Sequence, residues 1–132
     1  MSHSLEAVQK MAEAYTAAWC SGDPAAVAAH YAPDGEIIIN KGTPHSGTEA
    51  ITAMAAAFHG AFPGLTVLCD EVRSNGSHAI YVWTLEGTHK ESGNFVRLKG
   101  WEEWDLDADL KIAASRGWFD AEDEARQIAG GS

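Results

Sequence analysis

The 132-residue chain is predicted to fold as an α+β domain in which an antiparallel sheet covers a group of helices. Two observations predict this class. Apolar residues recur at helical spacing through the first half of the chain, and from Leu65 onward the period changes to two. Elements grouped in this way, helices first and strands second, are typical of α+β domains. Because the length is close to that of one domain, we expect a single domain over residues 1–132.

Three helices are expected in the first half. Ser4 can cap a helix that starts at Leu5 and ends at Ser21-Gly22. Asp23-Pro24 is typical of an N-cap followed by proline at the first helical position, so a short helix should run from Pro24 to about Tyr31. A turn and a short strand, residues 36–40, come next. Thr48 can cap the third helix, which Pro63-Gly64 stops. The apolar face of that helix contains Ile51, Met54, Ala55, Phe58 and Phe62.

Four long strands are expected in the second half, over residues 65–73, 78–89, 94–106 and 110–119. Ser74-Asn75-Gly76-Ser77 between the first two is a strong hairpin signal. Asp120 is a good N-cap for a short final helix, AEDEARQI. The strands should therefore form an antiparallel meander.

Composition excludes several classes of partner. A net charge of −10 would repel nucleic acid and anionic membrane surfaces. No apolar run approaches the length that spans a membrane, and the N-terminus lacks the features of a secretory signal. Cys20 and Cys69 lie in apolar stretches, which fits buried reduced thiols; a disulfide between them is the alternative. We expect a cytoplasmic protein.

The third long strand indicates which face is buried. One of its faces carries four charges, and the other carries only one, Glu102, so the second should point inward. On the preceding strand, Tyr81, Trp83 and, beyond the strand's end, His89 should share that side. On the following strand, pairing Leu106 with Leu110 would turn Ala114, Arg116 and Trp118 inward, with Ala114 opposite Glu102 and Arg116 about 7–8 Å away diagonally. A small domain rarely buries a charge among tryptophans unless the charge is paired or borders a cavity.

At this point the chain resembles the nuclear transport factor 2-like superfamily, and in particular its SnoaL-like branch. The similar segments are AYTAAWCSGDPAAVAAHYAPDGEI, HSGTEAI, WTLEGTH and VRLKGWEEWDL, in this order and spacing. The resemblance implies a cone-shaped curved sheet wrapped over three helices, with a pocket at its open end. It also implies a homodimer that packs through the sheet. Members include ketosteroid isomerases, polyketide cyclases, epoxide hydrolases and non-catalytic binding modules, so the fold implies a pocket and not a reaction.

Individual positions favour the cyclase-like branch. Where the steroid isomerases have their basic aspartate, this chain has Ile39 beside Asn40, whereas their second acid corresponds to Glu102. SRGWFD is similar to the closing strand of the epoxide hydrolases, but Gly117 stands in place of an acidic residue. The Arg/Asp pair of those enzymes is also absent from YVWTLEG. The GTH sequence at 87–89 and Glu102 suit the cyclases better.

Four residues are candidate catalytic groups, each with a structural alternative. Glu102 could be an acid/base whose pKa burial raises, or the partner of Arg116 in an ion pair that keeps it charged. His89 could donate a hydrogen bond or shuttle a proton, or simply lie at a strand end. Arg116 could hold a substrate oxygen. Asp120 could be a base, although a helix cap is the simpler interpretation.

The remaining candidates are apolar and aromatic residues that could hold a flat hydrophobic molecule, or simply form the core. They are Tyr15, Trp19, Met54, Phe58, Tyr81, Trp83, Trp104 and Trp118. No metal is expected, since H-x-x-x-H and C-x-x-C spacings are missing, and no cofactor is expected. Two hypotheses follow. The first is a cofactor-independent cyclase/isomerase-type enzyme that moves a proton next to a carbonyl of a small hydrophobic, ring-containing substrate. The second is a non-catalytic binding or dimerisation module.

Overall fold

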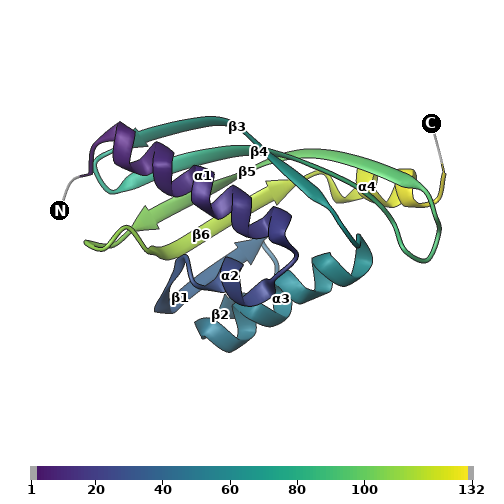
Figure 1. The fold of residues 1–132 in the computed structure, drawn as a ribbon, viewed down its shortest axis with the longest axis horizontal. Coiled ribbons are helices and arrows are strands. Elements are labelled where there is room, and N and C mark those ends of the chain that lie inside the picture. Colours follow the sequence, from purple (N-terminus) through teal and green to yellow (C-terminus); the bar gives the residue numbers. More distant parts are fainter. Residues whose placement is uncertain (1–2, 131–132) are drawn as a thin grey trace.

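The computed structural model describes residues 3–130 and places the N-terminal helices against a six-stranded sheet (Figure 1). Strand order across the sheet is β2-β1-β6-β5-β4-β3. The strands β3 to β6 form the predicted antiparallel meander, whereas β1 pairs with β6 in parallel, so the sheet is mixed. The elements are α1 (Leu5–Ser21), α2 (Pro24–Ala28), β1 (Tyr31–Ile39), β2 (His45–Ser46), α3 (Gly47–Ala61), β3 (Thr66–Asn75), β4 (His78–Thr88), β5 (Phe95–Leu106), β6 (Ile112–Phe119) and α4 (Ala121–Ile128).

The predicted α+β class is confirmed, and the boundaries differ where the sequence pattern is weak. β1 starts at Tyr31 rather than at residue 36, so α2 is shorter than expected. The two-residue strand β2 was not predicted, because so short a segment carries no periodic signal. α3 begins at Gly47, with Ser46 rather than Thr48 in the N-cap position.

Three helix starts have the predicted side-chain caps. The Ser4 hydroxyl accepts a hydrogen bond from the backbone N–H of Ala7 at 3.1 Å, and Asp23 accepts one from Ala25 at 3.0 Å. Asp120 does the same for α4, accepting from the N–H of Asp123 at 3.0 Å. These bonds satisfy N–H groups that the helix itself leaves without partners.

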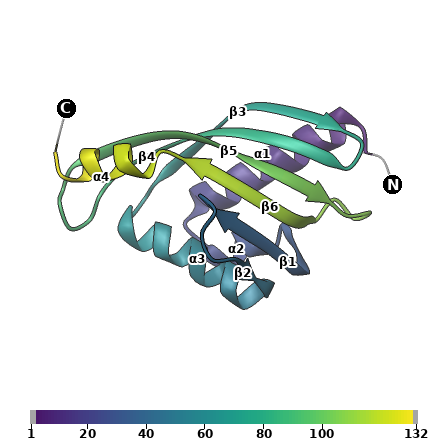
Figure 2. The ribbon, with the colours of Figure 1, turned by 180° about the vertical axis from the view of Figure 1, so that it is seen from behind.

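The core lies between the helices and the inner face of the sheet. From behind (Figure 2), β1 and β6 run side by side in front of α1 and α2, and α4 continues beyond the end of β6. The expected inner face of β5 is confirmed: Val96, Leu98, Gly100, Glu102, Trp104 and Leu106 are all buried. Across the ladder to β4, Tyr81 pairs with Glu102 and Trp83 with Gly100, which confirms the predicted inner face of β4 at these positions.

The predicted register between β5 and β6 is wrong from its first pair, because Leu106 does not pair with Leu110 and a β-bulge then interrupts the ladder. Leu106 pairs with Ile112 and Asp105 pairs with Ala114, so Ala113 is an extra residue on β6. One extra residue reverses the side on which every later side chain lies.

The bulge decides which β6 residues face inward. Opposite Glu102 lies Gly117 instead of Ala114, and Arg116 lies opposite Glu103 on the outer face. The prediction that Arg116 shares the interior with Glu102 is therefore wrong. Trp118 pairs with Trp101, and their rings stack with centroids 6.2 Å apart.

The expectations about membrane-spanning segments and about the two cysteines have different outcomes. Among residues 3–130, no helix combines the length and the apolar character needed to cross a membrane. Cys20 and Cys69 are both free thiols, but Cys20 is exposed and Cys69 only half-buried, so the expectation that both are buried is wrong. The Cys20 sulfur lies 3.3 Å from both the backbone nitrogen and the carbonyl oxygen of Val67.

Candidate functional site

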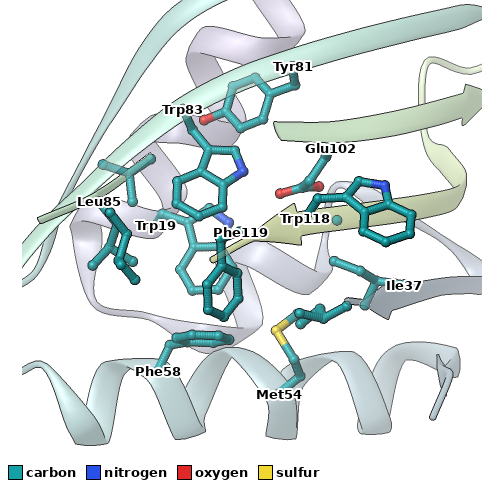
Figure 3. A pocket seen from close by; sticks show the side chains of 14 residues that line it. Trp19, Ile37, Met54, Phe58, Tyr81, Trp83, Leu85, Glu102, Trp118 and Phe119 are labelled. Atoms are coloured by element: carbon teal, nitrogen blue, oxygen red, sulfur yellow. The ribbon is translucent and has the colours of Figure 1, made fainter. Parts of the chain in front are cut away.

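An apolar cavity lies between the inner face of the sheet and the helices α1 and α3 (Figure 3). The space inside it measures about 60 Å³, which is small for a ligand site, so a ring-containing molecule can enter only if side chains of the wall move. The residues that line it are Trp19, Ile37, Ile39, Met54, Phe58, Val67, Tyr81, Trp83, Leu85, Leu98, Glu102, Gly117, Trp118 and Phe119. All of them except Glu102 are uncharged.

Regular spacing brings these side chains together. Met54 and Phe58 are four residues apart on α3, so they project from the same face of that helix. Ile37 and Ile39 alternate along β1, and Trp83 alternates with its neighbours on β4 in the same way. Each element therefore contributes a short row of apolar groups to one space.

Glu102 projects from β5 into this cavity and is 7% exposed. Its Oε1 accepts hydrogen bonds from Trp104 Nε1 at 2.8 Å and from the Ser115 hydroxyl at 2.9 Å. The Tyr15 hydroxyl donates to the same carboxyl, 3.1 Å from Oε1 and 3.2 Å from Oε2. In turn, the Tyr15 oxygen lies 2.8 Å from that of Tyr31. The carboxyl is thus held in one orientation by three donors.

The donors are not equivalent for the two oxygens. An indole N–H can only donate, so Oε1 facing Trp104 must be an acceptor in either protonation state. When Glu102 is protonated, its proton therefore belongs on Oε2. Figure 3 shows the carboxyl directed from β5 toward the indole of Trp83 and the ring of Phe119. Oε2 is hydrogen-bonded only weakly, by the Tyr15 hydroxyl at 3.2 Å, so it is the oxygen suited to exchange a proton with a molecule in the cavity.

Burial raises the pKa of Glu102, because the charged form loses its hydration. The hydrogen bonds from Trp104, Ser115 and Tyr15 favour the charged form and partly oppose this effect. Burial and the nearby Glu102 charge raise the pKa of Tyr15 well above its ordinary value, so the Tyr15 hydroxyl keeps its proton. A carboxyl whose pKa moves upward toward neutrality is suited to both accept and donate a proton.

The structure does not bring Arg116 to this carboxyl. Its Nε lies 3.0 Å from Glu103 Oε1, and its terminal nitrogens lie 3.4 Å from Asp105 Oδ2. All three side chains belong to the outer face of the sheet. The predicted ion pair between Glu102 and Arg116 is wrong, since the bulge at Ala113 turns Arg116 outward.

Neither His89 nor Asp120 lines the cavity. His89 follows β4 by one residue, and its Nδ1 lies 3.0 Å from the Ser92 hydroxyl and 3.2 Å from the Ser92 backbone nitrogen. Its ring packs edge-on against Phe62, with centroids 5.5 Å apart. This is the strand-end position. Asp120 is exposed and caps α4.

Most predicted apolar candidates do line the cavity: Trp19, Met54, Phe58, Tyr81, Trp83 and Trp118. Trp118 does so at an edge of the cavity, because its ring stacks on Trp101. Tyr15 and Trp104 lie behind the carboxyl and hydrogen-bond to it.

Ser115 was missed by the sequence interpretation, because the unrecognised bulge put its neighbours on the wrong face. Gly117 was missed for the same reason. A Cβ on Gly117 would lie 3.6 Å from Glu102 Cγ, an ordinary contact distance, so the glycine leaves space beside the carboxyl. The alternation of residues in β6 carries no signal for either residue, because only the extra residue Ala113 turns them inward.

No group of three or more His, Cys, Asp or Glu residues within 3–130 is arranged to hold a metal ion. The chemistry of the cavity thus centres on one carboxyl, three hydrogen-bond donors to it, and aromatic walls. The fold and this cavity define a domain of the ketosteroid isomerase-like, or nuclear transport factor 2-like, class.

The chain belongs to the SnoaL-like domain family, whose model matches residues 12–115. Three solved structures illustrate how widely the fold is shared. A hypothetical protein with a ketosteroid isomerase-like fold from Catenulispora acidiphila, solved in complex with trimethylamine, has a TM-score of 0.84 at 17% identity. The alignment covers 91% of this chain and 92% of that one. A SnoaL-like polyketide cyclase from Jannaschia has a TM-score of 0.78 at 20% identity, with 94% of both chains covered.

An epoxide hydrolase of M. tuberculosis, described as LEH-like, has a TM-score of 0.75 at 18% identity, covering 94% of this chain and 90% of that one. No curated protein sequence matches the chain. At these identities the structural relatives establish the fold alone. The distant relatives include cyclases, epoxide hydrolases and hydroxylases, and the reaction of this chain must be argued from its own cavity.

Proposed function

We propose that this domain is a cofactor-independent cyclase/isomerase-type enzyme that moves a proton next to a carbonyl. The observation that carries the proposal is the Glu102 carboxyl, which combines burial, a raised pKa and an orientation toward an apolar cavity. In the charged form its Oε2 would accept a proton from the carbon beside the carbonyl. In the protonated form it would return that proton to the same or another carbon.

The cavity walls support a small, hydrophobic, ring-containing substrate. Trp19, Phe58, Trp83 and Phe119 offer flat apolar surfaces from four different elements. Aromatic rings of this kind bind other rings by stacking or edge-on contact. Since Glu102 is the one charged group among the described residues that line the cavity, proton transfer there would depend on it alone.

The proposal is tested by the exchange of carbon-bound protons for deuterium. α-Tetralone, a bicyclic ketone with exchangeable protons beside its carbonyl, would be incubated with the protein in D₂O and followed by NMR. The unmodified protein should accelerate exchange over buffer. Glu102→Gln should lower the rate by about a hundredfold or more, since general base catalysis contributes a factor of about 10² to 10⁴.

The matched control is Glu103→Gln, which removes a neighbouring carboxyl on the outer face and should leave exchange unchanged. Binding of α-tetralone should survive in Glu102→Gln, because the amide keeps the size of the carboxyl. Equal exchange by the Glu102→Gln variant and the unmodified protein would overturn the proposal.

A second candidate function is a non-catalytic binding module. The observation that favours it is the filled set of hydrogen bonds around Oε1, since fully satisfied buried polar networks often serve to fix a structure. This alternative expects α-tetralone to bind with no exchange in any variant.

We further propose a homodimer through the outer face of the sheet, where Trp101 is 45% exposed. Sedimentation equilibrium tests it: a dimer should be found, and Trp101→Lys should dissociate it.

A further inference from the structure

The Trp83 indole carries a buried N–H that no group in the fold uses. Trp83 Nε1 is covered from solvent and has no hydrogen-bond partner among residues 3–130. Because an indole N–H can only donate, this group stays unsatisfied until an acceptor is supplied. Leaving a buried donor without a partner costs free energy, so such a group in a cavity wall requires an explanation.

Other buried atoms without a hydrogen-bond partner have a simpler explanation. His59 Nε2 lies 2.9 Å from the carbonyl oxygen of Trp19, so this ring already makes one hydrogen bond through its other nitrogen. Asp105 Oδ1 lies 2.7 Å from His78 Nδ1, in an ion-pair contact. Trp83 differs from both, because its free group is a donor at the wall of the apolar cavity.

The orientation of the Trp83 ring points this donor toward the acid/base. Figure 3 shows the nitrogen-bearing edge of the indole facing the Glu102 carboxyl from β4. The ring lies over Gly100, its partner on β5, where a Cβ would come within 2.4 Å of the ring carbon Cζ2. The glycine therefore lets the indole lie close to β5.

We propose that Trp83 Nε1 donates a hydrogen bond to the oxygen of the ligand, which makes Trp83 the residue that selects for a carbonyl. This inference rests on the proposed function and extends it. Arg116 and His89, the sequence-based candidates for this role, lie outside the cavity. The Trp83 N–H lines the same cavity as Glu102 and can donate the hydrogen bond to the ligand oxygen that was expected from those two residues.

The proposed step moves one proton and two electron pairs. The Glu102 carboxylate takes a proton from the carbon beside the carbonyl, and the electron pair of that C–H bond forms a carbon–carbon double bond. The electron pair of the C=O double bond moves onto oxygen, where the Trp83 N–H stabilises the new negative charge. Return of the proton from Glu102 to carbon reverses the shift and restores the carbonyl.

Binding must include a small movement, because the nitrogen is covered from solvent. Phe119 is a suitable moving part: it is half-buried, lines the cavity and contacts the Trp83 ring edge-on, with centroids 6.2 Å apart. A ligand ring that takes the place of Phe119 would lie against the Trp83 indole. The ligand class is accordingly a cyclic ketone rather than a hydrocarbon of the same shape.

The test compares α-tetralone with tetralin, the same skeleton without the oxygen. Their dissociation constants would be measured for the unmodified protein and for Trp83→benzothienylalanine, in which sulfur replaces the N–H and the ring shape is kept. The unmodified protein should bind the ketone with a dissociation constant about tenfold lower, which corresponds to a difference in binding free energy of about 1.4 kcal/mol. The variant should lose that preference while still binding tetralin. The same substitution at Trp101, on the outer face, is the matched control and should change neither constant.

A direct readout is the ¹H–¹⁵N signal of the Trp83 indole. It should shift downfield when α-tetralone binds and move less with tetralin. A ketone preference that persists in the Trp83 variant would overturn the inference, as would a failure of both compounds to bind at millimolar concentration. Loss of the preference without any deuterium exchange would instead keep Trp83 as the selector and reject proton transfer by Glu102.

Discussion

Trp83 and Gly100 form a directly opposed pair across β4 and β5, and the glycine is what allows the indole to lie where it does. A Cβ at position 100 would lie 2.4 Å from Cζ2 of Trp83 and 2.3 Å from the carbonyl oxygen of Trp118. Neither distance is compatible with unchanged neighbours. One position on β5 thus determines both the placement of the cavity's indole wall and the close approach of β6.

Gly100→Ala should destabilise the fold by about 1–3 kcal/mol, the usual cost of extra volume in a packed interior. Urea unfolding would measure this, and titration with α-tetralone should show weaker binding because the Trp83 ring is displaced. The control is Gly60→Ala in α3, where no atom outside the neighbouring residues and the backbone of the helix itself lies within 4 Å of the added Cβ. That change should stabilise the helix by up to about 1 kcal/mol. Equal stability of the two variants would show that the ring is not held by Gly100.

Gly117 leaves the space beside Glu102, so a larger side chain there should fill the cavity without disturbing the sheet. Gly117→Ala adds a Cβ at an ordinary contact distance and should keep the affinity for α-tetralone within a few-fold. Gly117→Val should weaken it by about tenfold or more, since the added methyl groups occupy ligand space. Isothermal titration would compare the variants. Unchanged binding by the valine variant would place the ligand elsewhere.

The inner face of β5 could be predicted because the opposite orientation of the strand would bury four charged side chains. Four charges share the outer face with Trp101, and only Glu102 breaks the apolar character of the inner one. Tyr81 and Trp83 were placed correctly on β4, because they share a face with Ala79 and Leu85 while the opposite face becomes polar at Thr84 and Glu86. The contrast in polarity between the two faces of each strand therefore predicted that part of the site.

The β6 half of the site could not be predicted, because periodicity does not reveal an inserted residue. The bulge at Ala113 separates Ile112 from Ser115 and sends Arg116 outward. The pairing of β1 with β6 contains a second irregularity that the sequence pattern does not reveal. The turn signal at residues 32–35 lies inside β1, whose pairing with β6 shifts between Tyr31 and Glu36. Where strand pairing is irregular in this way, the backbone pairing decides on which face of the sheet a residue lies. The alternation of apolar and polar residues does not predict that face.

Arg116 should have no influence on the acid/base, whereas Ser115 should. Arg116 is paired with Glu103 and Asp105 on the outer face, where partly exposed ion pairs contribute about 0–1 kcal/mol. Arg116→Met should therefore leave the pH dependence of deuterium exchange unchanged. Ser115→Ala removes a 2.9 Å hydrogen bond to Glu102 Oε1 that favours the charged form. The midpoint of its pH–rate profile should move to higher pH. A shift in the arginine variant and none in the alanine variant would reverse our assignment.

The raised pKa of Glu102 should also make stability depend on pH in a defined direction. The carboxyl titrates at about 4.3 when the chain is unfolded, and its pKa is higher in the fold because burial disfavours the charge. Its contribution to the free energy of unfolding is therefore complete below the unfolded pKa. That contribution is lost as the pH rises through the folded pKa. Each unit by which the folded pKa exceeds the unfolded one corresponds to about 1.4 kcal/mol.

Glu102→Gln is neutral at every pH and cannot show this loss. The free energy of unfolding of the variant, minus that of the unmodified protein, should accordingly rise as the pH increases from the unfolded pKa of Glu102 through its folded pKa. Urea unfolding at each pH measures the difference, and Glu103→Gln on the outer face serves as the control for general charge effects. A difference that falls with rising pH would mean that the bonds from Trp104, Ser115 and Tyr15 outweigh burial. Glu102 would then be a fixed structural anion, and the case for proton transfer in the cavity would fail.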